Sequence, residues 1–166
     1  MGTTENLQEA FAGESQANQT YMAHGKKAAA EGYPQIAKLF RAAAEAEKVH
    51  AQAHFRVMGG VKSTAENLQA AIGGEATEFT EMYPGFVAEA EREGNKGAVM
   101  SFENALAVEK IHHGLYTQAV KALTSGGDLP EAPIVVCGVC GNTVVGEAPD
   151  KCPICASPKS KFFAVA

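Results

Sequence analysis

Two short stretches of the sequence repeat the same pair of residue types at the same spacing. Glu47 precedes His50 by three positions in EKVH, and Glu109 precedes His112 by three positions in EKIH. A spacing of three puts both side chains on one face of an α-helix. A carboxylate oxygen beside an imidazole nitrogen is a ligand pair for a transition metal. One such pair alone is more often an exposed polar pair, so it is the duplication that favours a metal site.

Further glutamates continue the apolar stripes of the expected helices. Glu14 follows Leu7 and Phe11 at steps of three and four, and Glu78 and Glu81 precede Met82 on another segment. With the two Glu-x-x-His glutamates, five carboxylates point inward, and no lysine or arginine lies on the same stripes. Each unpaired buried charge costs several kcal/mol or more. Either most of these acids are protonated or, as we expect, metal ions lie among them.

The residues around these ligands have a helical pattern. Residues 1–124 are rich in Ala, Glu, Lys and Leu, with apolar residues at steps of three and four. Pro84 and Gly85 predict a kink or break just past Glu81. A short turn, a crossover of some fifteen residues and a second short turn are the connectivity of ferritin-like bundles. We expect long helices over residues 4–31, 34–58, 75–93 and 96–124, and a short helix over 63–72 within the crossover.

The positions of the acids agree with two antiparallel hairpins. Glu14 and Glu47 are nearly equidistant from the first expected turn, and Glu78 and Glu109 are equidistant from the turn at Gly94. Both hairpins therefore place their acids at mid-height. One glutamate from each of two helices, with Glu-x-x-His from each of two others, is the ligand set of ferritin-like di-iron and di-manganese proteins.

The remaining histidines and two tyrosines have simpler interpretations. His24 is expected on a helix surface, His113 points about 100° away from its neighbour, and His54 is expected in the core or behind the ligands. Tyr21 and Tyr116 are either ordinary core aromatics or hydrogen-bond partners of a ligating carboxylate. Tyr21 is our candidate for that second role.

All four cysteines lie near the end of the chain, in two CxxC pairs separated by eleven residues. Two such pairs can enclose one metal in a tetrahedral sulfur cage. A segment of about 33 residues also needs a metal to fold well. Sulfur ligands alone do not separate iron from zinc, so a structural zinc ribbon stays open. The four residues are Cys137, Cys140, Cys152 and Cys155.

Composition limits the partners and the organisation. The net charge is −5 and no basic run occurs, which argues against nucleic acid or an anionic membrane as the partner. No secretory signal and no stretch of about 18 apolar residues is present, so we expect a cytoplasmic protein. The change in composition predicts a helical domain over residues 1–124, a linker over 125–133 and a cysteine domain over 134–166.

Taken together, these motifs resemble the rubrerythrin family over the whole chain. The matching stretches are GES around Glu14, EKVH, EFTEMYP, EKIHHGLY and CGVCG followed by CPIC. The resemblance implies a mainly α fold, in which a ferritin-like four-helix bundle with one long crossover precedes a small rubredoxin-like domain. It implies two iron ions held by Glu14, Glu47, His50, Glu78, Glu81, Glu109 and His112, and one iron, with zinc as a possible substitute, held by the four cysteines.

The resemblance also implies an activity and partners. These are a non-haem peroxidase that reduces hydrogen peroxide to water, protection from oxidative stress, and an NADH-linked electron supply through a rubredoxin or an NAD(P)H-dependent reductase. Glu47 and Glu109 would bridge the irons, and Glu81 and His50 would alternate as ligands on reduction. Because the linker must turn back to reach its own bundle, we expect a head-to-tail homodimer. The alternatives are a ferroxidase, or an electron carrier or zinc-stabilised binding module with an inert bundle.

Overall fold

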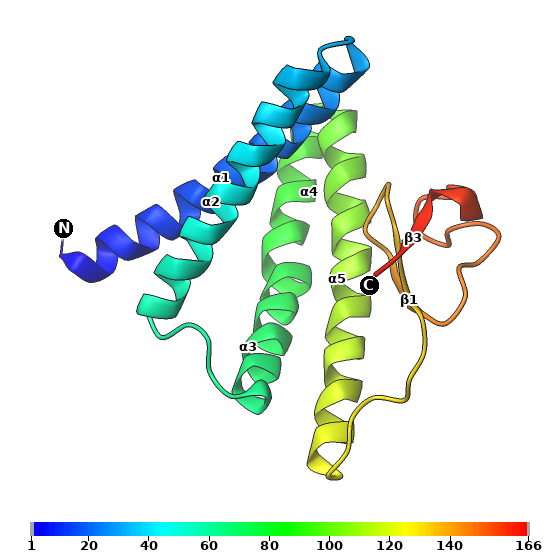
Figure 1. The fold of residues 1–166 in the computed structure, drawn as a ribbon. Helices are drawn as coiled ribbons and strands as arrows, with labels where there is room; N and C mark the ends of the chain where they lie inside the picture. The colour runs from blue at the N-terminus through cyan, green and yellow to red at the C-terminus, as the bar shows by residue number, and fades with distance from the viewer. Residues whose placement is uncertain (1, 166) are drawn as a thin grey trace. The chain divides into compact units, whose positions relative to one another are not determined.

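The computed structural model describes residues 2–165, which form two compact units divided between Lys62 and Ser63. The first unit is an antiparallel pair of helices, α1 (Thr3–Ala30) and α2 (Pro34–Val57). In the second unit, a third long helix packs against a fourth, and a small cysteine-containing module follows (Figure 1). The mainly helical fold and the small terminal sheet confirm the expected fold class.

Small residues bring α1 and α2 close together. Asn18 Nδ2 donates a hydrogen bond of 2.7 Å to the Ala44 carbonyl, and the rings of Phe11 and Phe55 stack with centroids 5.0 Å apart. Pro34 is the first residue of α2, where its missing N–H leaves no hydrogen bond unmade. The buried residues of this hairpin form a seam of glycine and alanine: Gly25, Ala28, Ala37, Ala44 and Ala51.

The third long helix differs from its expected form. It runs without a break through α3 (Thr64–Thr77), a π-helical turn η1 (Glu78–Met82) and α4 (Tyr83–Arg92). The expected separate short helix is thus the first part of the long one, and only residues 58–63 connect it to α2. Ser63 begins it with a capping box, in which its Oγ accepts from the Glu66 N–H.

The predicted disturbance near Pro84 takes the form of η1. A proline lacks an N–H and crowds the carbonyl four residues back, and a π turn is one way to absorb both effects without ending the helix. Asn95 then caps the fourth helix, α5 (Lys96–Thr124), by accepting from the Ala98 N–H at 3.1 Å. Gly94 supplies the left-handed turn between the two helices, with φ +70°.

The cysteine module is a three-stranded antiparallel sheet in the order β2–β1–β3. Its elements are β1 (Ile134–Cys137), β2 (Thr143–Val145), a 3₁₀ turn η2 (Lys159–Lys161) and β3 (Phe162–Ala164). The module packs on α5 of its own unit, because β2 contacts that helix and Val108 of α5 is only 2% exposed.

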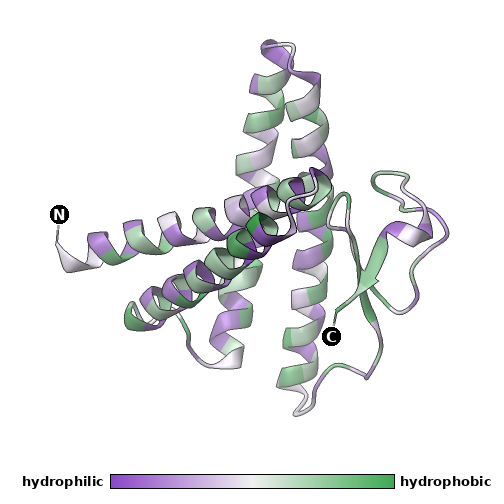
Figure 2. Cartoon of the chain, turned by 45° about the horizontal axis from the view of Figure 1, so that its top comes forward, coloured by the Kyte–Doolittle hydropathy of each residue, from purple (hydrophilic) through white to green (hydrophobic). Residues whose placement is uncertain are grey.

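Polar and apolar residues alternate along the helices, as Figure 2 shows by colour. This alternation is the pattern of helices that bury one face and expose the other. Along residues 2–165, none of the helices combines the length and the apolar character that crossing a membrane would require.

Candidate metal centres

The first unit gathers three of the predicted ligands. Glu14 of α1 approaches Glu47 and His50 of α2, and one ligand atom from each lies within 4.8 Å of the others. His50 Nδ1 is 3.0 Å from Glu47 Oε2 and 3.8 Å from Glu14 Oε1. The histidine side chain is 55% exposed, whereas the two carboxylates are less so. This unit therefore presents two oxygen donors and one nitrogen donor on one face.

The second unit contains a matching cluster with one unexpected member. Glu109 and His112 of α5 meet Glu75 of α3, and again their ligand atoms lie within 4.8 Å. His112 Nδ1 is 2.7 Å from Glu109 Oε2 and 3.8 Å from Glu75 Oε2. Burial raises the pKa of Glu75 to about 7, and the hydrogen bond and negative charge of Glu109 add to the shift. Buried carboxyl groups that raise one another's pKa values form a site that a cation would stabilise.

The structure separates the two predicted ligands of the third helix. Glu78 is half-buried, and burial followed by the charge of Glu109 raises its pKa while His112 lowers it, so it lies in the field of the cluster. Glu81 is exposed and stands outside both clusters. The difference follows from η1: a π turn holds more residues than the 3.6 of an α turn, so each residue rotates by less than 100° and Glu81 does not return to the face of Glu78 as regular spacing predicts.

The four cysteines converge as the two CxxC pairs predict. All four Sγ atoms lie within 4.8 Å of one another, with 3.7 Å between those of Cys137 and Cys155 and 3.6 Å between those of Cys140 and Cys152. The hydroxyl of Ser157 lowers the pKa of Cys155 to about 6, whereas burial raises that of Cys140. Four sulfurs at this spacing fit one tetrahedral metal ion.

The other histidines and Tyr21 lie outside the two helical clusters. The ring of His24 meets Phe40 edge-on at 5.4 Å. His24 is exposed, as expected for a helix surface, whereas His113 is half-buried and meets Phe79 edge-on at 5.5 Å. Tyr21 is half-buried, with its ring 6.2 Å from that of Phe40. Its role beside a ligating carboxylate stays a prediction.

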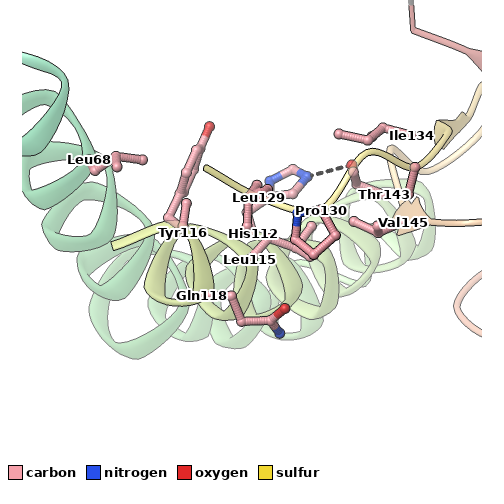
Figure 3. A pocket seen from close by; sticks show the side chains of 12 residues that line it. Leu68, His112, Leu115, Tyr116, Gln118, Leu129, Pro130, Ile134, Thr143 and Val145 are labelled. Carbon is pink, nitrogen blue, oxygen red and sulfur yellow. Dashed lines mark hydrogen bonds between the residues drawn. The ribbon is translucent and has the colours of Figure 1, made fainter. Parts of the chain in front are cut away.

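Two residues that the sequence argument did not single out take part in the second unit's cluster. Glu75 is one, and its position three residues before Glu78 was the available signal. The other is Thr143 of β2, whose Oγ1 is 2.9 Å from His112 Nε2. Figure 3 shows this contact, marked by a dashed line, at the edge of a cavity of about 510 Å³. No local pattern predicts a contact between residues 31 positions apart.

Both kinds of cluster fit iron. Carboxylate and imidazole ligands suit a non-haem iron, and within residues 2–165 the ion pairs of the clustered glutamates are with His50 and His112, which are themselves candidate ligands. Four thiolates suit a mononuclear iron centre that changes valence with little rearrangement. The fold and the sites thus define a metalloprotein in which a ferritin-like helical domain precedes a rubredoxin-like domain.

Comparison with known proteins gives the family. The rubrerythrin family model matches residues 5–120, and the model of the rubrerythrin rubredoxin-like domain matches residues 136–163. The chain belongs to the rubrerythrin family. Its cofactors are accordingly a pair of iron ions in the helical domain and a further iron at the four cysteines, and the family is one of oxidoreductases.

Similar proteins match nearly the whole chain. Rubrerythrin-2 of Clostridium acetobutylicum is 35% identical, over 98% of this chain and 96% of that relative. The rubrerythrin of Porphyromonas gingivalis is 36% identical, over 96% and 88%. A solved structure of nigerythrin in a partially reduced state is 35% identical and has a TM-score of 0.59, over 99% of this chain and 88% of that one.

Proposed function

We propose that this protein is a non-haem di-iron peroxidase that reduces hydrogen peroxide to water and protects the cell from oxidative stress. The observation that carries the proposal is the contact between the module of the four cysteines and a histidine of the Glu75–Glu109–His112 cluster. An electron-carrier site and a substrate site need such proximity. The relatives are named rubrerythrin or nigerythrin, which supports the iron-containing family but names no substrate.

We further propose that the helical ligands serve one di-iron centre. The expected set is Glu14, Glu47, His50, Glu78, Glu81, Glu109 and His112, with Glu47 and Glu109 as the bridging carboxylates. Glu75 competes with Glu81 for the place of the additional carboxylate, because Glu75 lies in the cluster and Glu81 is exposed. The glutamate that binds iron as the additional carboxylate would be the ligand that His50 replaces when the site is reduced.

The reaction balances with two electrons from the donor. One hydrogen peroxide, two electrons and two protons give two water molecules. An iron pair held by these residues would supply both electrons together, which is the chemistry that O–O cleavage without release of a radical needs. The glutamates neutralise the charge of the oxidised site, and the histidines, being neutral ligands, favour its reduced form. The cysteine module receives electrons from outside.

The electron donor would be a rubredoxin or an NAD(P)H-dependent reductase, which makes the activity NADH-linked in the cell. The shortest covalent route from the cysteines runs from Cys140 through Gly141 and Asn142 to Thr143, and then across the hydrogen bond to His112. We also propose a cytoplasmic location, because paired thiolates stay available to a metal in a reducing compartment.

The head-to-tail homodimer stays a proposal, but its original reason no longer holds. We expected a return of the linker within one chain to be awkward. In the structure the linker residues Leu129 and Pro130 line one cavity with Leu115 and Ala119 of α5, so the linker runs back along that helix. The cysteine module therefore contacts α5 of its own chain, and the course of the linker is no longer an argument for the dimer.

The deciding experiment compares oxidants on the iron-loaded, chemically reduced chain. We expect rapid reoxidation of both iron centres by hydrogen peroxide and much slower reoxidation by oxygen, followed in the visible spectrum. Faster turnover with oxygen, with ferric mineral as the product, would support a ferroxidase instead. Zinc at the cysteines and no iron in the helical part would leave only a zinc-stabilised module.

A further inference from the structure

The two ring nitrogens of His112 face different surroundings. Nδ1 points to the oxygens of Glu109, at 2.7 Å, and Glu75, at 3.8 Å, whereas Nε2 is 2.9 Å from Thr143 Oγ1. Figure 3 shows the second contact, in which the ring and the threonine side chain point toward each other. A neutral imidazole has one donor and one acceptor nitrogen, so the partner of Nε2 decides which nitrogen can bind a metal.

The direction of the hydrogen bond follows from counting protons on Thr143. Its hydroxyl has one hydrogen, and Oγ1 donates it to the Gly141 carbonyl at 3.1 Å. With the hydroxyl hydrogen assigned to the Gly141 carbonyl, Oγ1 accepts from His112 and Nε2 carries a proton. The lone pair of a neutral ring is then on Nδ1, and the proton of the 2.7 Å contact between Nδ1 and Glu109 Oε2 belongs to the carboxyl group, where a metal ion would replace it.

We propose that Thr143 is a positioning residue that makes His112 a metal ligand through Nδ1, by accepting the Nε2 proton. This inference rests on the proposed function, because it requires a metal in the helical clusters. It assigns to the cysteine module a second task besides carrying electrons: one of its side chains sets the tautomer and orientation of a ligand in the helical domain.

The backbone around Thr143 is held firmly enough for this task. Asn142 is only 1% exposed, and its Nδ2 donates to Cys152 Sγ at 3.7 Å. Gly141 turns the chain with φ +85° and donates its N–H to the Cys137 carbonyl. Thr143 itself pairs with Val136 in the sheet. The hydroxyl is therefore fixed by the same loop that holds the cysteines.

His50 provides a comparison within the same chain. It has the same Glu-x-x-His spacing and its Nδ1 also faces carboxylates, but among residues 2–165 its Nε2 has no hydrogen-bond partner. It is also more exposed than His112, at 55% against 28%. The ring of His50 is thus held at Nδ1 alone, whereas the ring of His112 is held at both nitrogens. The two histidines are not equivalent ligands.

The test uses full-length chain labelled with ¹⁵N at histidine and loaded with zinc, which is diamagnetic. Long-range ¹H–¹⁵N spectra identify the metal-bound nitrogen of His112, and the His112→Gln variant assigns its signals. We expect metal on Nδ1 and a slowly exchanging proton on Nε2. Metal on Nε2, or an Nε2 proton that exchanges as fast as one in free imidazole, overturns the inference.

Variants add a second readout, the zinc affinity of the helical clusters. Removing a hydrogen-bond partner behind a ligating histidine costs about 10–100-fold in metal affinity, so we expect Thr143→Val to bind about 10-fold more weakly. Thr143→Ser keeps the hydroxyl and should restore both affinity and slow exchange. Thr117→Val is the matched control, because the Thr117 hydroxyl lies on α5 but donates to the His113 carbonyl at 2.7 Å.

The outcomes separate this inference from the proposed function. Normal zinc binding in all variants, with unchanged exchange at His112, overturns the role of Thr143 and leaves the peroxidase proposal intact. Helical clusters that bind no metal in the unaltered chain overturn both. Should Thr143→Val fail to fold, the spectrum of the unaltered chain and the Thr143→Ser variant still decide.

Discussion

The carboxyl groups of Glu75 on α3 and Glu109 on α5 lie together, with one oxygen of each within 4.8 Å of the other. Both side chains are mostly buried, with 17% and 16% exposed, so burial and the charge of Glu109 favour a proton on Glu75. In the metal-free protein this proton reduces the repulsion between the two carboxylates, as a bound cation would in the metal-loaded protein. Proton and metal therefore compete for this cluster.

The stability of the chain with metal-free helical clusters should depend on pH through Glu75. Its pKa is raised from 4.5 to about 7. Between these values the folded state binds more protons than the unfolded state, so its free energy of unfolding falls as pH rises and levels off above about pH 7. Glu75→Gln cannot ionise and should lose this decline. Urea titrations at a series of pH values measure the difference.

Glu81→Gln is the matched control for that experiment, since Glu81 is exposed on the neighbouring turn. Its pH profile should coincide with that of the unaltered chain. A Glu75→Gln profile that still falls as steeply between pH 4.5 and about 7 would show that Glu75 ionises normally in the folded protein.

The same two variants decide which glutamate binds iron. Loss of a ligand should weaken iron binding by at least about 10-fold, since even a change behind a ligand costs that much. We expect Glu75→Gln to lose iron from the helical part and Glu81→Gln to keep it, as measured by iron analysis after dialysis against a chelator. The reverse result would restore Glu81 as the additional carboxylate.

Ser157 should tune the cysteine site. Its hydroxyl is the largest cause of the lowered pKa of Cys155, at about 6, and the two side-chain atoms are 3.3 Å apart. Ser157→Ala removes a donor to the thiolate, so the pKa of Cys155 should rise and protons should compete better with metal. The pH at which cobalt binding is half complete, read from thiolate absorption, should move upward.

Ser160→Ala is the control for Ser157, because it removes a hydroxyl from the neighbouring turn η2 and has no contact with the cysteines among the hydrogen bonds of residues 2–165. An unchanged cobalt profile in Ser157→Ala would mean that the Ser157 hydroxyl does not stabilise the thiolate.

The α1–α2 seam should tolerate no larger side chain. A Cβ on Gly25 would lie 3.3 Å from the Ala37 carbonyl oxygen and 3.4 Å from Phe40 Cβ, so Gly25→Leu overpacks the seam and should destabilise the chain by about 1–3 kcal/mol. Gly13 is exposed on the same helix with nothing within 4 Å of such a Cβ. Gly13→Leu should therefore stabilise the chain by up to about 1 kcal/mol. Thermal unfolding of both variants tests the contrast.

The sequence predicts what local rules control. The start of α2 at Pro34, the turn at Gly94 and the four-cysteine cluster follow from backbone preferences and ligand spacing, and the structure confirms them. The Glu-x-x-His pairs also join clusters as expected, because their geometry lies within one helix.

Departures arise where packing or an irregular turn decides. The pair Gly73 and Gly74 stays helical because the helix around it packs along α5. Counting at 3.6 residues per turn cannot anticipate η1, and so it does not predict that Glu81 lies outside the two helical clusters in this structure. Thr143 contacts His112 because the linker runs back along α5, and the spacing of residues in the sequence does not predict such a long-range contact.

The glycine and alanine seam of the first hairpin has a consequence for its ligands. Where only glycine and alanine are buried between two helices, their axes can approach closely, and Glu14 and Glu47 project from those axes. Their mutual spacing thus depends in part on residues that carry almost no side chain. A bulky replacement in the seam would move the oxygens of Glu14 and Glu47 apart. Residues that bind no metal therefore affect the geometry of the metal ligands.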